Sequence, residues 1–135
     1  MRVTFIAGLP GSGKTHLAQH MYWQGNPIEP WLVDDITELS QLVGRHWVPN
    51  ISHMIVTDPH FCRLTTRPLA EGVIWDWYQI PVHWIFFENN PEQCKRNVMQ
   101  RIAQGDDRKV MGMIDALTKI YTIPKGADVR PVYCG

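Results

Sequence analysis

The sequence predicts a three-layer α/β/α sandwich, in which helices cover both faces of a parallel β-sheet. Short, continuously apolar segments alternate along the chain with longer segments of helical pattern. Strands that are buried on both faces have this character, and they are typical of parallel sheets. With 135 residues, of which 44% are hydrophobic, the chain is large enough for one domain with its own core. We therefore expect residues 1–135 to form a single domain.

Five segments are short and apolar enough to be strands. The first ends at a glycine, and the second and third end at aspartates. Ligands of such sheets bind beyond the carboxyl ends of the strands, so we expect Gly8, Asp34 and Asp58 to gather at one edge. The expected strands are Val3–Ala7, Trp31–Val33, Met54–Thr57, Val82–Phe87 and a small closing strand, Val129–Tyr133.

Helices are expected between the strands, each bounded by residues that interrupt a helix. Gly25 and Pro27 end the first helix, and Gly105 separates the last two. Thr66 is expected to cap the third helix, two residues ahead of a proline. Residues 91–110 are expected to form a small helical lid. The expected helices are Lys14–Trp23, Ile36–Val43, Arg67–Tyr78, Pro91–Gln104 and Arg108–Tyr121.

The composition limits the classes of partner. Lys+Arg and Asp+Glu are balanced at 13 each, so no global positive field holds nucleic acid non-specifically. No segment approaches the roughly 20 apolar residues of a membrane helix, and the three cysteines contain no C-x-x-C pair. We therefore expect a soluble cytoplasmic protein with reduced thiols and no membrane partner. Large aromatic side chains favour burial, and the tryptophans expected in the core are Trp75, Trp77 and Trp84.

One motif carries the expected chemistry. Residues 8–15, Gly-Leu-Pro-Gly-Ser-Gly-Lys-Thr, match G-x-x-x-x-G-K-[ST] in full, between an expected strand and an expected helix. Glycines let successive backbone N–H groups turn toward a polyphosphate, and the helix N-terminus attracts the same anion. Lys14 would bind the β- and γ-phosphates of ATP, and the hydroxyl of Thr15 would bind Mg²⁺. The expected ATP-binding residues are Gly8, Gly11, Ser12, Gly13, Lys14 and Thr15.

Acidic residues at two other strand ends suit the remaining roles of a phosphotransferase. Asp58 would hold Mg²⁺ or its water shell beside Thr15, or it could cap the turn before Pro59. A hydroxyl needs a base before it can attack phosphorus. Asp34 is favoured as this base from its place at the strand tip, with Asp35 as the alternative.

Basic residues after the fourth expected strand could act on the transferred group. An arginine held in the same chain can stabilise the charge that develops on the γ-phosphate oxygens. We expect Arg96 and Arg101 to do so from the lid, although such runs are commonly solvated faces. The same residues form the local basic patch through which nucleic acid could bind, which comprises Lys95, Arg96, Arg101, Arg108 and Lys109.

With these residues identified, the chain resembles the kinase domain of phage polynucleotide kinase and its P-loop relatives over about residues 1–121. The shared features are the glycine motif, an Asp-Asp pair after the second strand, the V-T-D strand end at Asp58, and C-K-R-N with a further arginine. The resemblance implies that Asp34 is the general base, that Lys14 and Thr15 hold phosphate and Mg²⁺, and that Arg96 and Arg101 are lid arginines.

The resemblance also implies an acceptor. In that family an arginine three residues after the base contacts the acceptor's phosphate, whereas this chain has Thr37 there. A related group resembles the chain more closely in size: phage kinases that phosphorylate 5-hydroxymethyluracil within DNA. The expected acceptor is therefore the 5-hydroxymethyl group of 5-hydroxymethyldeoxyuridine in DNA, or a polynucleotide 5′-hydroxyl. Two alternatives stay open: a kinase of nucleosides or metabolites, and an ATPase module that transfers no phosphate to an acceptor.

Overall fold

The computed structural model describes residues 2–23, 31–34, 42, 53–103 and 110–134. Within these residues, five parallel strands form one sheet in the order β2-β3-β1-β4-β5. The strands are β1 (Arg2–Ala7), β2 (Trp31–Asp34), β3 (His53–Thr57), β4 (Val82–Phe87) and β5 (Asp128–Arg130). The helices are α1 (Lys14–Trp23), α2 (Thr66–Tyr78), α3 (Pro91–Ala103) and α4 (Met111–Thr118), with a 3-10 helix η2 (Pro59–Cys62).

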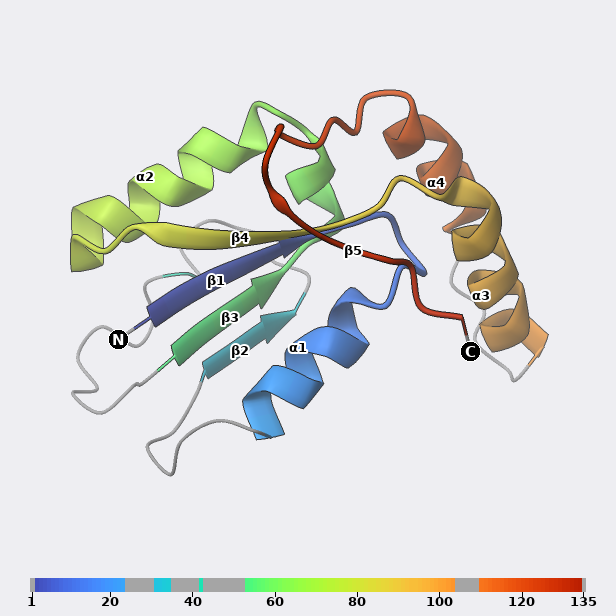
Figure 1. Ribbon diagram of the computed structural model, residues 1–135, viewed down its shortest axis with the longest axis horizontal. Coiled ribbons are helices and arrows are strands. Elements are labelled where there is room, and N and C mark those ends of the chain that lie inside the picture. Colours follow the sequence, from blue (N-terminus) through green and yellow to red (C-terminus); the bar gives the residue numbers. More distant parts are fainter. Residues whose placement is uncertain (1, 24–30, 35–41, 43–52, 104–109, 135) are drawn as a thin grey trace.

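Helices lie on both faces of the sheet, as the strand pattern predicts. Helix α1 covers one face and α2 covers the opposite face (Figure 1). Helices α3 and α4 pack against each other beyond the end of the sheet toward which the strands point (Figure 1). The three-layer α/β/α sandwich is therefore confirmed.

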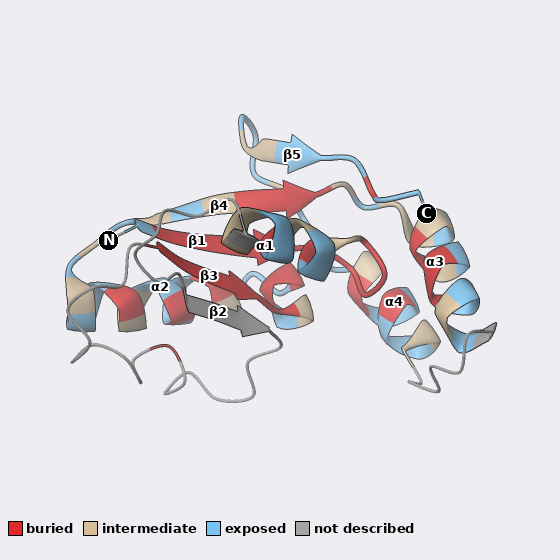
Figure 2. Cartoon of the chain, turned by 90° about the horizontal axis from the view of Figure 1, so that it is seen from below, coloured by how far each residue is buried: buried red, intermediate tan, exposed pale blue. Residues whose placement is uncertain are grey.

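The central strands are buried on both sides (Figure 2). In β1, Phe5 packs into the core beneath α2, and its neighbour Ile6 packs into the core beneath α1. The same alternation recurs in β3 and β4, because successive side chains of a strand point to opposite faces. Two apolar cores thus hold the sheet rigid and fix the position of the loop that follows β1.

Three expected boundaries were wrong. The last helix ends at Thr118, not at residue 121, because Lys119 caps it and the chain turns there. Strand β5 ends at Arg130, ahead of Pro131, which cannot donate to a sheet. Thr65, and not Thr66, is the N-cap of α2, and no side-chain hydrogen bond accompanies that cap.

Two of the three tryptophans expected in the core were predicted wrongly. Trp75 and Trp77 are 56% and 52% exposed, whereas Trp84 is partly buried against the core. The buried stripe of α2 runs through Arg67, Ala70 and Ile74 at helical spacing. Trp75 follows the last of these by one residue, which rotates it away from the sheet.

The expected helix Ile36–Val43 lies outside the described residues except for Leu42, which is buried in the core. Arg108 and Lys109 of the expected basic patch, and Asp35 and Thr37, are also outside the described residues. Within the described parts of the chain, none of the helices combines the length and the apolar character that a membrane crossing needs.

Candidate active site

Residues 8–15, which we call the phosphate loop, connect β1 to α1 at the carboxyl edge of the sheet and include the start of α1 (Figure 1). Gly11 and Gly13 have φ values of 83° and 104°, a region that side chains with a Cβ rarely adopt. The space is also restricted: a Cβ on Gly11 would stand 2.5 Å from the Cys94 carbonyl oxygen, and one on Gly13 would stand 2.8 Å from Cβ of Tyr133. The glycines of the motif are therefore required by both backbone angle and packing.

Polar groups inside the loop are arranged for an anion. The Ser12 side chain is fully buried, and among the described residues its Oγ is the buried side-chain polar atom that has no hydrogen-bond partner. Lys14 is only 7% exposed, and its Nζ donates to the Leu9 carbonyl at 3.1 Å. Helix α1 begins here, with Leu17 N–H bonded to the Gly13 carbonyl, and the N–H groups of its first turn carry partial positive charge. These features fit the phosphates of a nucleotide.

Helix α3 lies directly against this loop. Cys94, Val98 and Arg101 share one face of α3 at helical spacing, and all three approach Gly11. A terminal nitrogen of Arg101 lies 3.3 Å from the place of a Cβ on Gly11. Arg96 is instead exposed and donates to Gln93 of its own helix at 3.3 Å. Of the two expected lid arginines, the structure brings Arg101 to the phosphate loop.

The remaining described residue of the basic patch, Lys95, forms an ion pair of 2.5 Å with Asp115, which joins α3 to α4. Both side chains are substantially exposed, so the pair contributes little to stability. Among the described residues of the patch, Lys95, Arg96 and Arg101 therefore each have a different environment.

The two acidic candidates end neighbouring strands. Asp34 is the last residue of β2 and stands opposite Thr57 in the register, and Asp58 follows Thr57 directly. On the other side of β3, Thr57 pairs in register with Ile6, near the end of β1. The backbone therefore places both aspartates at the edge that carries the phosphate loop, as expected from the strand pattern.

Asp58 has a structural task of its own. Its side chain is 2% exposed and caps η2, with Oδ1 accepting the His60 N–H at 2.7 Å. Pro59 follows at the first position of that turn. The side chain is thus fixed in orientation by the cap that the sequence offered as the alternative to a metal role, and a capping oxygen does not prevent the carboxylate from supporting a cation.

Two buried thiols flank Lys14. Burial raises the pKa of the Cys62 thiol to about 11, although the positive charge of Lys14 acts in the opposite direction. Burial likewise raises the pKa of Cys94 to about 11, against the charges of Lys14 and Arg101. Both groups are therefore protonated thiols at neutral pH, and they line the loop as small apolar side chains.

Comparison with known proteins identifies a viral relative of this chain. No family model matches the sequence. The chain is 30% identical over 131 residues to Uncharacterized protein R277 of Acanthamoeba polyphaga mimivirus, over 90% of this chain and 87% of that protein. The chain belongs to the family of that viral protein.

Solved structures similar to this family member are distant in sequence. A gluconokinase from Sinorhizobium meliloti 1021 superposes with a TM-score of 0.64 at 10% identity, over 97% of this chain and 82% of its own. The APS kinase CysC of Mycobacterium tuberculosis, solved in complex with AMPPNP and APS, gives 0.55 at 17%, over 96% and 86%. The structure of APE1195 gives 0.62 at 17%, over 98% and 84%. These likenesses show the P-loop NTPase fold.

Two side chains that contact this site were not predicted from the sequence. Asn97 on α3 donates to the Gly11 carbonyl at 2.8 Å, and it also donates to the Tyr133 carbonyl. Tyr121 donates through its hydroxyl to the Phe87 carbonyl and, at 3.4 Å, to the Ala7 carbonyl just before the loop. No local pattern identifies these contacts, because the partners are between 34 and 114 residues apart.

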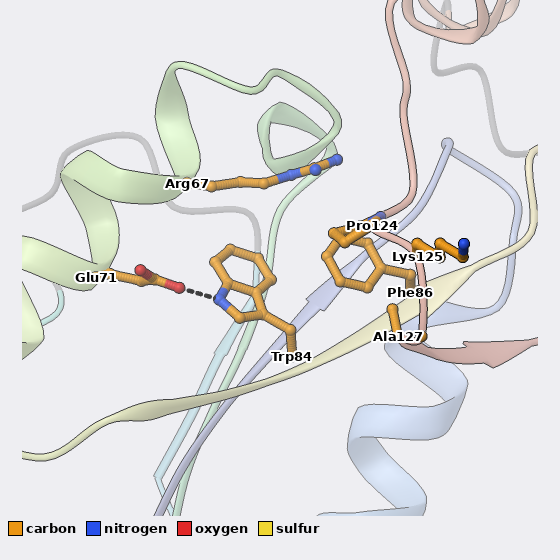
Figure 3. A pocket seen from close by; sticks show the side chains of 8 residues that line it. Arg67, Glu71, Trp84, Phe86, Pro124, Lys125 and Ala127 are labelled. Atoms are coloured by element: carbon orange, nitrogen blue, oxygen red, sulfur yellow. Dashed lines mark hydrogen bonds between the residues drawn. The ribbon is translucent and has the colours of Figure 1, made fainter.

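A separate cleft lies between α2 and residues 124–127 (Figure 3). Trp84 and Phe86 form its aromatic floor, with ring planes 17° apart. The Arg67 guanidinium stacks over Phe86 at 4.8 Å and donates to two backbone carbonyls. Glu71 accepts a hydrogen bond from the Trp84 indole (Figure 3). Arg67 and Glu71 are therefore both bonded within the protein, and their bonds link the segments that line the cleft. The carbonyls are those of Phe61 and Thr122.

Proposed function

We propose that this chain is an ATP- and Mg²⁺-dependent kinase that transfers the γ-phosphoryl group to a hydroxyl. The observation that carries the proposal is the buried Ser12 hydroxyl without a partner, inside a loop whose glycines, lysine and helix N-terminus all favour an anion. The names of two structural neighbours, a gluconokinase and an APS kinase, support phosphoryl transfer.

The roles of the residues follow from their places. ATP-Mg²⁺ supplies the phosphoryl group and its leaving group. Lys14, with the first-turn N–H groups of α1, binds the phosphates, and the Thr15 hydroxyl with Asp58 supports the metal. Arg101 stabilises the charge on the transferred group from α3. Asp34 accepts the proton of the acceptor's hydroxyl group. The hydroxyl oxygen then bonds to the γ-phosphorus, while the bond between the γ-phosphorus and the bridging oxygen of the β-phosphate breaks.

For the acceptor we propose a hydroxyl on nucleic acid, either the 5-hydroxymethyl group of 5-hydroxymethyldeoxyuridine in DNA or a polynucleotide 5′-hydroxyl. The order of motifs in the sequence supports this choice, as does the membership of a viral protein in the family. A small-molecule acceptor is the second candidate, favoured by the names of the gluconokinase and the APS kinase.

A transfer experiment separates these acceptors. Purified protein is incubated with γ-labelled ATP, Mg²⁺ and, in parallel, 5-hydroxymethyluracil DNA, 5′-hydroxyl DNA, RNA, nucleosides and a panel of sugars and metabolites. Label in a nucleic acid supports the first choice, and label only in a small molecule replaces it with the second. Free labelled phosphate without a labelled acceptor contradicts the kinase assignment and indicates an ATPase. Lys14→Ala, purified in the same way, is the control: any transfer that remains in this variant comes from a contaminating enzyme.

The assignment of the base has its own test. Asp34→Asn should lower transfer by about 10²-fold or more while ATP affinity changes little, because the base contacts the acceptor and not the nucleotide. Asp35→Asn is the matched control at the adjacent position. If Asp35→Asn loses transfer and Asp34→Asn does not, the base is the second aspartate of the pair.

A further inference from the structure

Asn97 connects three segments that are far apart in the sequence. Its side chain is 8% exposed, and its amide nitrogen donates to the Gly11 carbonyl of the phosphate loop at 2.8 Å and to the Tyr133 carbonyl at 2.5 Å. Gln93, one turn earlier on α3, donates to the Asn97 amide oxygen at 3.0 Å. That bond fixes the amide with its nitrogen directed at the two carbonyls.

Tyr133 passes this constraint on to the next peptide of the loop. Its backbone N–H donates to the Ser12 carbonyl at 2.9 Å, so one residue both accepts from Asn97 and donates to the loop. The Tyr133 ring also packs against His16 of α1, with ring centroids 4.9 Å apart. The Gly11 and Ser12 carbonyls are thus both held from outside the loop.

The orientation of a carbonyl determines that of the N–H across the same peptide. A trans peptide is planar, and its C=O and N–H point in opposite directions. Holding the Gly11 and Ser12 carbonyls toward α3 and Tyr133 therefore directs the N–H groups of Ser12 and Gly13 away from those elements. Glycine at positions 11 and 13 permits the left-handed angles seen there but does not select them. Within the loop, the Ser12 N–H also donates to the Leu9 carbonyl at 3.1 Å.

We propose that Asn97 is a positioning residue for phosphate binding, which orients the Gly11–Ser12 peptide directly and the Ser12–Gly13 peptide through Tyr133. This inference rests on the proposed function, because it assumes that the loop binds a nucleotide. It gives α3 a role in addition to presenting Arg101: the helix holds the phosphate cradle in its binding shape.

Substitutions at Asn97 distinguish orientation from packing. Asn97→Ala removes both donated bonds and leaves a void, whereas Asn97→Asp keeps the shape but turns an acceptor toward two carbonyls. An orienting role predicts that ATP affinity falls in the order Asn, Ala, Asp, with at least about a tenfold loss for Asp, the factor that one lost hydrogen bond gives. Because the carboxylate of Asn97→Asp also repels the triphosphate, the neutral variant Asn97→Leu, of similar shape, separates the two roles. An orienting role predicts that Asn97→Leu loses ATP affinity as Asn97→Ala does, and a packing role predicts that it retains wild-type affinity.

Asn89→Asp is the matched control. Asn89 likewise donates from its amide to backbone carbonyls, at Thr118 and Tyr121, but it makes no such bond to the phosphate loop. Calorimetric titration with ATP-Mg²⁺, together with thermal unfolding of each variant, gives affinity and stability separately. The proposal expects Asn89→Asp to lose stability and to keep its ATP affinity.

The outcomes are distinct. Wild-type ATP affinity for Asn97→Asp, better binding by Asp than by Ala, or an equal loss in Asn89→Asp would overturn the role of Asn97. If the wild type itself binds no ATP, the proposed function fails, and the inference fails with it. If Asn97→Asp does not fold, the test passes to Asn97→Ala against Asn89→Ala, and equal ATP affinity in these two variants overturns the proposal.

Discussion

Two groups of buried polar side chains, one around Arg67 and one in the phosphate loop, differ in how completely they are bonded. Arg67 donates to the carbonyls of Phe61 and Thr122 and stacks over Phe86. The phosphate loop instead holds a buried Ser12 hydroxyl that has no partner among the described residues. An unbonded buried polar group costs free energy, and a protein retains one where a ligand completes it. The contrast supports a structural role for the Arg67 cluster, and an unbonded Ser12 hydroxyl is what the proposed function expects of a loop that binds an anion.

Lys14→Ala should have the largest effect on activity. Loss of a charge that stabilises the transferred group typically costs about 10²–10³-fold in rate. Stability should change less, because Lys14 is only 7% exposed and its removal also relieves the cost of burying a charge. Transfer of label from ATP and thermal unfolding measure the two quantities. A large loss of stability with normal activity would contradict the proposed role of Lys14 in transfer and would indicate that it acts, like Arg67, in stability.

Arg67→Met should show the opposite pattern. It leaves the buried Phe61 carbonyl and the more accessible Thr122 carbonyl without their donor, and it should lower the free energy of unfolding by about 1–3 kcal/mol. ATP affinity of the folded variant should stay at the wild-type value. Arg63→Met, at an exposed arginine of the same segment, is the control and should be nearly neutral. Urea denaturation and calorimetry together test this prediction.

His53 is a buried polar residue with a bonded side chain, and its contribution to stability should depend on pH. Its ring nitrogen bonds the Thr4 hydroxyl at 2.7 Å, and burial, aided by the charges of Arg2 and His83, lowers its pKa to about 4. The folded state therefore favours the neutral ring. Its contribution of up to about 3 kcal/mol is complete above pH 6.5 and is lost as the pH falls toward 4. His53→Gln should lose less stability than the wild type between pH 7 and 4.5 in urea denaturation.

The matched control for this effect is His20→Gln, because His20 is exposed on α1 and is not among the groups that lower the pKa of His53. If the wild type and His53→Gln lose the same stability on acidification, then other groups cause the acid sensitivity.

Asp58 has both a structural role, as the cap of η2, and a proposed role in metal binding. Asp58→Asn should have the smallest effect on stability. Asparagine caps a turn about as well as aspartate does, so unfolding should shift little. If the carboxylate supports Mg²⁺, the concentration of Mg²⁺ needed for half-maximal transfer should rise by about tenfold or more. An unchanged Mg²⁺ requirement would contradict the proposed metal role of Asp58.

Most of the fold was predictable, because it follows from local patterns. The phosphate motif fixes the junction of β1 and α1, and apolar runs bounded by glycine, proline or aspartate gave β3, β4, α2 and α3 to within a residue or two. Of the candidate site, the sequence also predicted that Asp34 and Asp58 lie at one edge of the sheet, and the structure adds that their strands are neighbours. Their proposed roles in base and metal chemistry stay predictions.

The rest depended on contacts that no local pattern encodes. Asn97 reaches Gly11 across 86 residues, and only the packing of α3 on the loop brings them together. Arg96 and Arg101 looked equivalent in the sequence, yet the helical period turns Arg101 toward the loop and leaves Arg96 on the surface. Trp75 shows the same effect, since its hydrophobic character did not determine which face of α2 it occupies.

The place of β1 at the centre of the sheet has a consequence for how the chain assembles. This strand comes first in the sequence, but its two neighbours start at His53 and Val82. Every sheet contact of β1 closes a long loop, and proteins dominated by such distant pairings fold slowly for their size. During synthesis its apolar side chains have no strand partner until β3 has emerged, so β1 is the segment where a chaperone would be expected to bind a nascent chain.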